Sequence, residues 1–157
     1  MKHRYWLYSL IIILGVILDQ WTKQLVVTHI HTSSEFQHVL PVLSIVRTHN
    51  TGISFGMLSS LNLGIWFYGV LVLSIIVFLI TLMLKTPRAL NQLAFVLMMA
   101  GAIGNLIDRI TRGYVVDFIS VHWFEKYYFY VFNVADILVS CGAGLIILDA
   151  LIEKRTS

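Results

Sequence analysis

The chain has 157 residues, of which 58% are hydrophobic and only 12% are charged, and its mean hydropathy is +0.83. This composition is too apolar for a soluble domain, and the length suits one domain. The formal net charge of +3 is small, and the basic residues lie near the ends of apolar segments rather than in one patch, which argues against nucleic acid as a partner. We therefore expect residues 1–157 to form a single integral membrane domain.

Hydropathy and segment length predict four membrane-spanning helices. In chain order they lie at about residues 5–27, 64–84, 89–110 and 131–152, and the second carries no charged residue. The first span begins like a secretory signal, with basic residues and an apolar run. It is followed by "DQWTK" rather than by a small-residue cleavage site, so we expect it to be retained.

The connections between these spans differ in basic residues. Most lysines and arginines lie at the N-terminus, between the second and third spans and at the C-terminus: Lys2, Arg4, Lys85, Arg88, Lys154 and Arg155. The other two connections carry only Arg47, Arg112 and Lys126. The positive-inside rule then predicts that both termini are cytoplasmic and that the loops at about 28–63 and 111–130 lie outside.

The two outer loops contain their own structural signals. The stretch "EFQHVLPVLSIVRTH" is rich in β-branched residues and partly alternating, which predicts one or two short strands. The following "NTGISFGML" predicts a turn and a short apolar flap in the membrane interface, and the aromatic "HWFEKYYFYVF" is typical of an anchoring belt. The predicted fold is thus an all-α membrane protein of four transmembrane helices, with a small extracytoplasmic β-containing loop and an interfacial flap.

Four of the five aspartates meet at the outer face in this topology, although they are far apart in sequence: Asp19, Asp108, Asp117 and Asp136. The fifth, Asp149, falls at the cytoplasmic end of the fourth span, where it is most simply a residue that reaches the interface. Ionisable groups within a membrane are costly and usually face the bundle interior, where they mark function. The outer face is therefore the candidate functional site.

Helical spacing sharpens this prediction. One face of the third span carries Gly101, Asn105, Asp108 and Arg109, and the fourth span begins with Asn133 and Asp136 at i and i+3. Ser140, Ala143 and Gly144 continue that face as a stripe of small residues, which predicts close approach of a neighbouring helix. The single cysteine, Cys141, lies inside the apolar fourth span and is interpreted as a packing residue.

Five short motifs run in order through nearly the whole chain: "DQWTK" at 19–23, "NTGISFG" at 50–56, "GAIGNLIDR" at 101–109, "GYVVDFI" at 113–119 and "FNVAD" at 132–136. Each is weak evidence alone, whereas five in register are specific. Through these motifs, its length and its four predicted spans, the chain resembles bacterial lipoprotein signal peptidase (signal peptidase II), a family of intramembrane aspartic proteases.

The resemblance implies that Asp117 and Asp136 form a catalytic dyad. Two close carboxyls share one proton, so that one can activate water while the other donates a hydrogen bond to the scissile carbonyl, without metal or other cofactor. Four residues are implied to bind substrate or support the dyad: Asn50, Asn105, Arg109 and Asn133. Five are implied to hold the scaffold: Asp19, Lys23, Gly101, Gly104 and Asp108.

The family also implies a substrate and a location. The expected reaction is endopeptidase cleavage of the signal peptide from a diacylglyceryl-modified prolipoprotein, on the N-terminal side of the lipidated cysteine. The expected location is the bacterial cytoplasmic (inner) membrane, with the active site near its outer face. The partners are then the prolipoprotein and membrane lipids, without nucleic acid. A monomer is the simplest state, because one chain supplies both acids.

Other functions remain open from the residues alone. A small proton-coupled transporter could be built around Asp19 in the first span, but it leaves Asp117 and Asp136 without a role. A metal protein is weaker, because the histidines lack the HExxH spacing of a zinc protease. The GxGD signature of presenilin-type proteases is absent from the sequence. A purely structural membrane protein gives no reason to gather asparagines and acids at one face.

Overall fold

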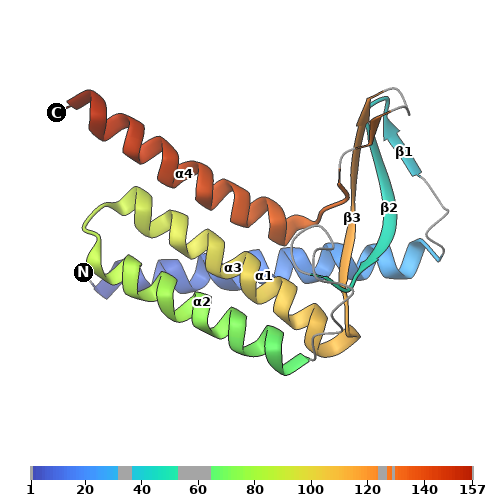
Figure 1. Cartoon of the computed structure of the whole chain (residues 1–157), viewed down its shortest axis with the longest axis horizontal. Coiled ribbons are helices and arrows are strands. Elements are labelled where there is room, and N and C mark those ends of the chain that lie inside the picture. Colours follow the sequence, from blue (N-terminus) through green and yellow to red (C-terminus); the bar gives the residue numbers. More distant parts are fainter. Residues whose placement is uncertain (1, 32–36, 53–64, 124–126, 129, 157) are drawn as a thin grey trace.

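The computed structural model describes residues 2–31, 37–52, 65–123, 127–128 and 130–156. The elements follow in the order α1 (Lys2–His29), β1 (Gln37–Leu40), β2 (Leu43–Asn50), α2 (Ile65–Lys85), α3 (Ala89–Arg112), β3 (Val115–Trp123), β4 (Tyr127–Tyr128) and α4 (Val134–Thr156). Figure 1 shows the four helices running toward the sheet, with both termini at the opposite end of the molecule.

All four helices are long and apolar enough to cross a membrane, which confirms the predicted spans. Their outward faces carry large apolar side chains, such as Trp66 (85% exposed), Val70 (66%) and Leu73 (62%) of α2. In water such a surface would be unfavourable, whereas in a bilayer it contacts lipid. The predicted flap lies within residues 53–64, outside the described residues.

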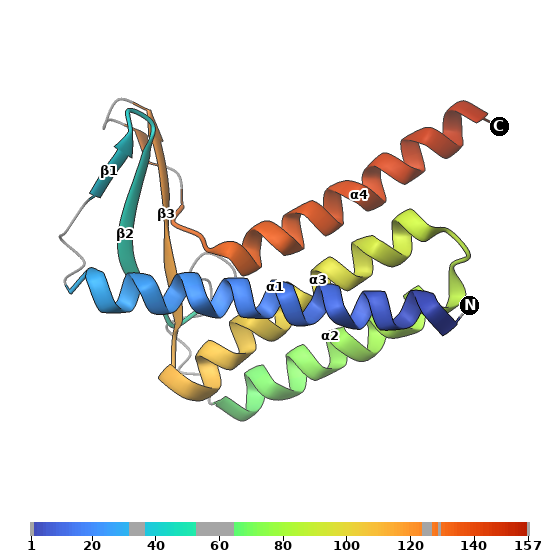
Figure 2. The ribbon, with the colours of Figure 1, turned by 180° about the vertical axis from the view of Figure 1, so that it is seen from behind.

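Helix α3 is the central helix and packs against α1, α2 and α4. Figure 2 shows α1 crossing the face of the molecule opposite to the one that Figure 1 presents. Nine residues of α3 are buried, and they include small residues such as Gly101 and Gly104 and the charged Asp108. An apolar cluster between α1, α2 and α3 stabilises the end away from the sheet; it comprises Tyr8, Leu79, Met83, Phe95, Val96 and Met99.

The strands form one antiparallel sheet in the order β1-β2-β3-β4. The β1 and β2 strands were predicted, but β3 was not, because the strand signals were sought in the first outer loop and the second was noted only for the aromatic segment at 122–132. Strand β3 pairs with β2 so that Asp117 lies opposite Thr48. Val116 and Phe118 pack on Val26 and Ile30 at the end of α1, which fixes the sheet against the helices.

The contact face of α4 also differs from the prediction. A Cβ on Gly142 would lie 2.6 Å from the carbonyl oxygen of Ala94, so this glycine allows α3 and α4 to approach closely. A Cβ on Gly144 would meet no atom of the described residues within 4 Å. The close approach of a neighbouring helix that the stripe of Ser140, Ala143 and Gly144 predicted is therefore not found at Gly144. Ala135 and Gly142, at i and i+7, mark the face that packs on α3.

Candidate active site

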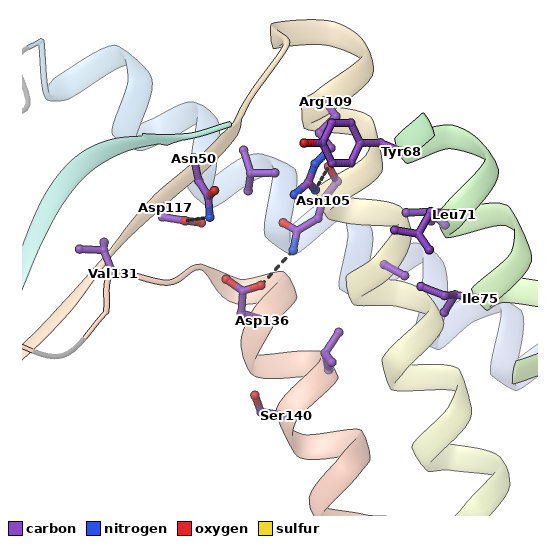
Figure 3. Close-up of a pocket in the computed structure, with 14 residues that line it drawn as sticks. Asn50, Tyr68, Leu71, Ile75, Asn105, Arg109, Asp117, Val131, Asp136 and Ser140 are labelled. Atoms are coloured by element: carbon purple, nitrogen blue, oxygen red, sulfur yellow. Dashed lines mark hydrogen bonds between the residues drawn. The ribbon is translucent and has the colours of Figure 1, made fainter. Parts of the chain in front are cut away.

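Asp117 and Asp136 reach the same cavity from different elements. Asp117 lies in β3 and is only 4% exposed, whereas Asp136 is half-buried in the first turn of α4. The cavity has a volume of about 310 Å³ (Figure 3). It is lined by polar residues at the sheet end and apolar residues along α2, α3 and α4: Asn50, Tyr68, Leu71, Val72, Ile75, Ala102, Asn105, Arg109, Val115, Asp117, Val131, Asp136, Val139 and Ser140.

A reciprocal cap at the start of α4 fixes the position of Asp136. Asn133 accepts a hydrogen bond of 3.0 Å at Oδ1 from the backbone N–H of Asp136. In return, Asp136 accepts one of 3.2 Å at Oδ2 from the backbone N–H of Asn133. This is a capping box with Asn and Asp in place of Ser/Thr and Glu/Gln, and the helix dipole favours an acid in the first turn. Local backbone chemistry thus explains why an apolar helix begins with a carboxylate.

Two asparagines connect the two acids. The Nδ2 of Asn133 donates to Oδ1 of Asp117 (2.6 Å) and to Oδ1 of Asn105 (3.2 Å). Asn105 in turn donates from Nδ2 to Oδ1 of Asp136 (2.9 Å), as the dashed line in Figure 3 marks. The chain from Asp117 through Asn133 and Asn105 to Asp136 holds both carboxyls in one hydrogen-bonded network, in which each amide has an assigned direction.

The environment of Asp117 moves its pKa up toward neutral pH. The pKa of Asp117 is raised from 3.8 to about 6, mainly by burial and in smaller part by the charge of Asp136. Hydrogen bonds from Asn50 (2.9 Å to Oδ2) and from Asn133, together with the charge of Lys23, oppose this rise in the pKa. A carboxyl that is raised in this way and faces a second acid is the arrangement expected of a dyad that holds one proton.

Arg109 lies at the same cavity and contacts the segment that follows β2. Its Nη2 donates to the carbonyl oxygen of Gly52 (2.7 Å), and its guanidinium carbon lies 4.9 Å from the ring centroid of Tyr68. The hydroxyl of Tyr68 donates to the carbonyl oxygen of Thr51 (2.9 Å). The buried Nε of Arg109 has no hydrogen-bond partner among the described residues. Buried donors are nearly always satisfied, so this N–H is available to an acceptor in the cavity.

Behind the cavity lies a cluster of charges without solvent contact. Asp19, Lys23 and Asp108 are each 0% exposed. The Nζ of Lys23 lies 2.9 Å from Oδ2 of Asp19 and 3.2 Å from Oδ2 of Asp108, and Asp108 also pairs with Arg112. Two acids and two bases therefore neutralise one another. Removing one partner of such a buried pair leaves an uncompensated charge, which typically costs about 3–5 kcal/mol.

This buried cluster also holds the backbone next to each acid of the dyad. Oδ1 of Asp19 accepts a hydrogen bond of 2.9 Å from the backbone N–H of Ala135, the residue before Asp136. Oδ2 of Asp108 accepts one of 3.0 Å from the backbone N–H of Val116, the residue before Asp117.

Lys23 links the same cluster to the bridging asparagines. In addition to its two ion pairs, its Nζ donates to Oδ1 of Asn105 at 2.9 Å. Since Asn105 uses its own Nδ2 to reach Asp136, Lys23 fixes which way this amide points.

Gly101 and Gly104 provide the space that this arrangement needs. A Cβ on Gly104 would lie 2.6 Å from Oδ2 of Asp19, and a Cβ on Gly101 would lie 2.3 Å from the carbonyl oxygen of Ala135. Neither contact is tolerable without a backbone or side-chain shift. All eleven candidate residues thus lie in the cavity or directly behind it.

Three further residues were not anticipated from the sequence. Tyr68 looks like any aromatic residue of an apolar span. Gln20 donates from Nε2 to Asp108 (3.2 Å) and to the carbonyl oxygen of Gly104 (3.0 Å). The third residue is Arg112, which pairs with Asp108. Its i, i+4 spacing from Asp108 was the one sequence signal that could have predicted this ion pair. The described residues contain no group of three or more His, Cys, Asp or Glu that could hold a metal ion.

The fold and the site define a class, namely multi-pass membrane proteins with two carboxyls in one cavity at the end of the helix bundle. Comparison with known proteins narrows this class. The model of a family described as signal peptidase (SPase) II matches residues 11–152. The chain belongs to this family, and it is accordingly a peptidase of the aspartic class, as the five motifs predicted.

Individual relatives agree with the family match. The lipoprotein signal peptidase of Tolumonas auensis is 39% identical over 148 residues, which cover 90% of this chain and 88% of that protein. The lipoprotein signal peptidase of Brucella ovis is 38% identical, with coverage of 98% and 95%. A bacterial membrane enzyme solved by the in meso method at 2.3 Å resolution is 32% identical, with a TM-score of 0.83 and coverage of 96% and 90%.

Proposed function

We propose that this protein removes signal peptides from lipoprotein precursors, with Asp117 and Asp136 as its catalytic dyad. The observation that carries the proposal is the bridge of Asn105 and Asn133, which joins the two carboxyls at one cavity. Structural acids are usually paired with bases, as Asp19 and Asp108 are. The two dyad acids are instead held by neutral amides, which orient them without neutralising them.

The proposed chemistry uses one proton shared by the pair. The ionised carboxyl accepts a proton from a water molecule as its oxygen attacks the scissile carbonyl carbon. The protonated carboxyl donates a hydrogen bond to the carbonyl oxygen as negative charge develops there. The proton taken from water then passes to the leaving amine as the C–N bond breaks, which restores the pair. Neither a metal nor a covalent intermediate enters this sequence.

The proposed substrate is a diacylglyceryl-modified prolipoprotein, cut on the N-terminal side of the lipidated cysteine. The relatives are named lipoprotein signal peptidases, and the cavity suits such a substrate. It is polar around the dyad and apolar along Leu71, Val72 and Ile75 of α2 and Val139 of α4. The polar part is suited to a peptide backbone, and the apolar part to a signal helix or acyl chains.

The supporting residues divide into two groups under this proposal. Asn50, Asn105, Asn133 and Arg109 line the cavity or orient the acids, and the Nε of Arg109 is directed to a backbone carbonyl of the substrate. The second group holds the scaffold behind the dyad: Asp19, Lys23, Gly101, Gly104 and Asp108. Asp19 is fully buried in an ion pair rather than open to the cavity, which speaks against a transporter built on it.

The proposed setting is the bacterial cytoplasmic membrane, with both termini cytoplasmic and the dyad near the outer face. The uneven distribution of lysine and arginine supports this orientation. Both termini lie at the end of the helices away from the sheet and cavity (Figure 1). One chain supplies both acids, so the proposed enzyme works as a monomer surrounded by lipid.

Mass spectrometry of the products tests the proposed specificity. The purified protein is incubated in detergent with a prolipoprotein that carries the diacylglyceryl group and with the same precursor without it. We expect a single cut before the lipidated cysteine and at least a tenfold slower reaction without the lipid, since about 1.4 kcal/mol of lost binding already gives this factor. Cleavage elsewhere, or equal rates for both precursors, would contradict the proposed substrate.

A further inference from the structure

A second cavity lies at the far end of the helix bundle from the dyad. It has a volume of about 510 Å³ and is formed where α1 begins and α2 gives way to α3. In Figure 1 the N-terminus and the α2–α3 connection lie next to each other at this end. The lining residues described are Arg4, Tyr5, Leu84, Lys85, Thr86, Pro87 and Gln92. The proposed peptidase reaction does not use any of them.

The cavity carries two positive charges without a carboxylate among its described lining residues. Arg4 and Lys85 are both exposed. Two acids of α4, Asp149 and Glu153, pair with Arg88 (2.8 Å and 2.6 Å), which is not among the described lining residues of this cavity. Uncompensated cations at the wall of a cavity attract an anion, and the low dielectric of nearby lipid strengthens this attraction.

Gln92 fixes the arginine in the cavity. It is only 6% exposed and accepts hydrogen bonds of 2.9 Å at Oε1 from Nη1 of Arg4 and from the hydroxyl of Tyr8. Its Nε2 donates to the carbonyl oxygen of Thr86 (2.8 Å). This buried amide thus ties the first turn of α1 to the α2–α3 connection. A planar guanidinium held at one nitrogen keeps its other N–H groups to bind two oxygens of an anion such as a phosphate.

The position of the cavity identifies the source of that phosphate. Arg4 begins the first membrane-spanning segment and Lys85 ends the second, so both lie at the level where lipid headgroups meet water. Tyr5 (44% exposed) and Leu84 (61%) add apolar surface at the same opening. A free phosphate ion gains nothing from contact with this apolar surface. A phospholipid can bury the surface under its glycerol and first acyl carbons.

We propose that this cavity binds the headgroup of an anionic phospholipid, with Arg4 and Lys85 holding its phosphate. A zwitterionic lipid carries its own cation next to the phosphate and is therefore bound less well. The geometry resembles the basic pockets between membrane helices that select anionic lipids. The site is separate from the dyad, so binding persists in an inactive Asp136→Asn variant and does not depend on the proposed reaction.

Native mass spectrometry tests this proposal with the intact chain in detergent. The probes are phosphatidylglycerol and phosphatidylcholine with identical acyl chains, each added at equal concentration. We expect a clear preference for phosphatidylglycerol in the wild type. One basic residue near anionic lipid is worth roughly a fivefold preference, so Arg4→Gln with Lys85→Gln should lower the preference by roughly tenfold to thirtyfold.

Control variants separate a specific site from general charge. Lys154→Gln removes an exposed cation at the same end of the molecule but outside the cavity, and it should keep the preference. The double variant Arg4→Lys with Lys85→Arg keeps both positive charges, so it should keep most of the preference for phosphatidylglycerol. Thermal unfolding and peptidase activity report whether the neutral double variant is folded.

Each remaining outcome contradicts the proposal. It fails if the folded double variant retains the lipid preference, or if Lys154→Gln loses it equally. Competition by millimolar inorganic phosphate would identify a site for free anions rather than for a lipid headgroup. Equal binding of both lipids by the wild type would remove the basis for an anionic headgroup.

Discussion

Asp19 of α1 accepts a hydrogen bond of 2.9 Å from the backbone N–H of Ala135, the residue immediately before Asp136. These groups are 116 residues apart in sequence, yet this bond joins the first span to the start of α4. The same carboxylate pairs with Lys23 at 2.9 Å. Asp19 therefore stabilises the helix bundle and also positions the first turn of α4, which carries Asp136.

The first prediction concerns this residue. Asp19→Ala removes the partner of the Ala135 amide and leaves part of the buried charge of Lys23 uncompensated, so we expect a loss of stability of about 3–5 kcal/mol. Asp149→Ala is the matched control, because Asp149 is also ion-paired but lies at the other end of α4 and its partner Arg88 is 38% exposed. The control should cost no more than about 1 kcal/mol. Equal unfolding temperatures for both variants would contradict a structural role for Asp19.

The second prediction concerns pH. The pKa of Asp117 is raised from 3.8 to about 6, so the proton of the pair is lost as the pH rises through this value. We expect kcat/KM to fall on the alkaline side of about pH 6, where the dyad no longer holds a proton to donate. The hydrogen bond from Asn50 stabilises the ionised form of Asp117 and lowers its pKa. Asn50→Ala should therefore move the alkaline limb to higher pH.

The position of this limb, rather than the rate, is the measured quantity, because Asn50 also lines the cavity. Asn91→Ala serves as the control, since Asn91 bonds to Asp149 at the far end of α4 and should leave the limb in place. A shift of the Asn50 variant toward lower pH, or no shift, would show that this amide does not set the protonation of Asp117.

The third prediction uses two glycines of the central bundle. A Cβ on Gly101 would lie 2.3 Å from the carbonyl oxygen of Ala135, so Gly101→Ala must push α3 and α4 apart. We expect a loss of about 1–3 kcal/mol and a lower kcat, because the displaced α4 carries Asp136. A Cβ on Gly144 has open space among the described residues, so Gly144→Ala should leave stability unchanged or raise it slightly. Similar melting temperatures for the two variants would exclude tight α3–α4 packing at Gly101.

The fourth prediction concerns Tyr68, whose hydroxyl holds the carbonyl of Thr51 and whose ring contacts Arg109. Tyr68→Phe removes only the hydrogen bond, which typically contributes about 0.5–1.5 kcal/mol. We expect KM to rise a few fold with little change in kcat, since Arg109 binds the substrate backbone under the proposed function. Tyr68→Leu also removes the ring and should raise KM further. If both variants kept the wild-type KM, Tyr68 would not position Arg109.

The sequence predicted the helices well because their signal is simple. A run such as 64–84 has no charge and the length of a bilayer, so little else can form from it. The acids were also found without the structure, because an ionisable residue in an apolar segment stands out. The i, i+3 spacing of Asn133 and Asp136 even contained the cap that the structure reveals.

Other features could not be predicted because they depend on distant partners. The first half of β3, residues 115–118, is buried on both faces and therefore lacks the alternation of apolar and polar residues that marks a half-exposed strand. The register that places Asp117 opposite Thr48 follows from pairing with β2, 69 residues away along the chain. Close approach of a neighbouring helix was predicted at Gly144 but occurs at Gly142, because the two glycines are alike in sequence and only packing distinguishes them.

The most direct test of the central claim is the cleavage rate of a diacylglyceryl-modified prolipoprotein by the wild type, Asp117→Asn, Asp136→Asn and the control Asp149→Asn. Asparagine keeps the shape of each side chain but cannot take the proton of water. We expect both dyad variants to lose at least about a thousandfold in kcat, in the range for removed acid–base groups, with unfolding temperatures near that of the wild type. The control should retain activity. Cleavage by either folded dyad variant at a rate near that of the wild type would contradict the assignment of Asp117 and Asp136 as the catalytic pair.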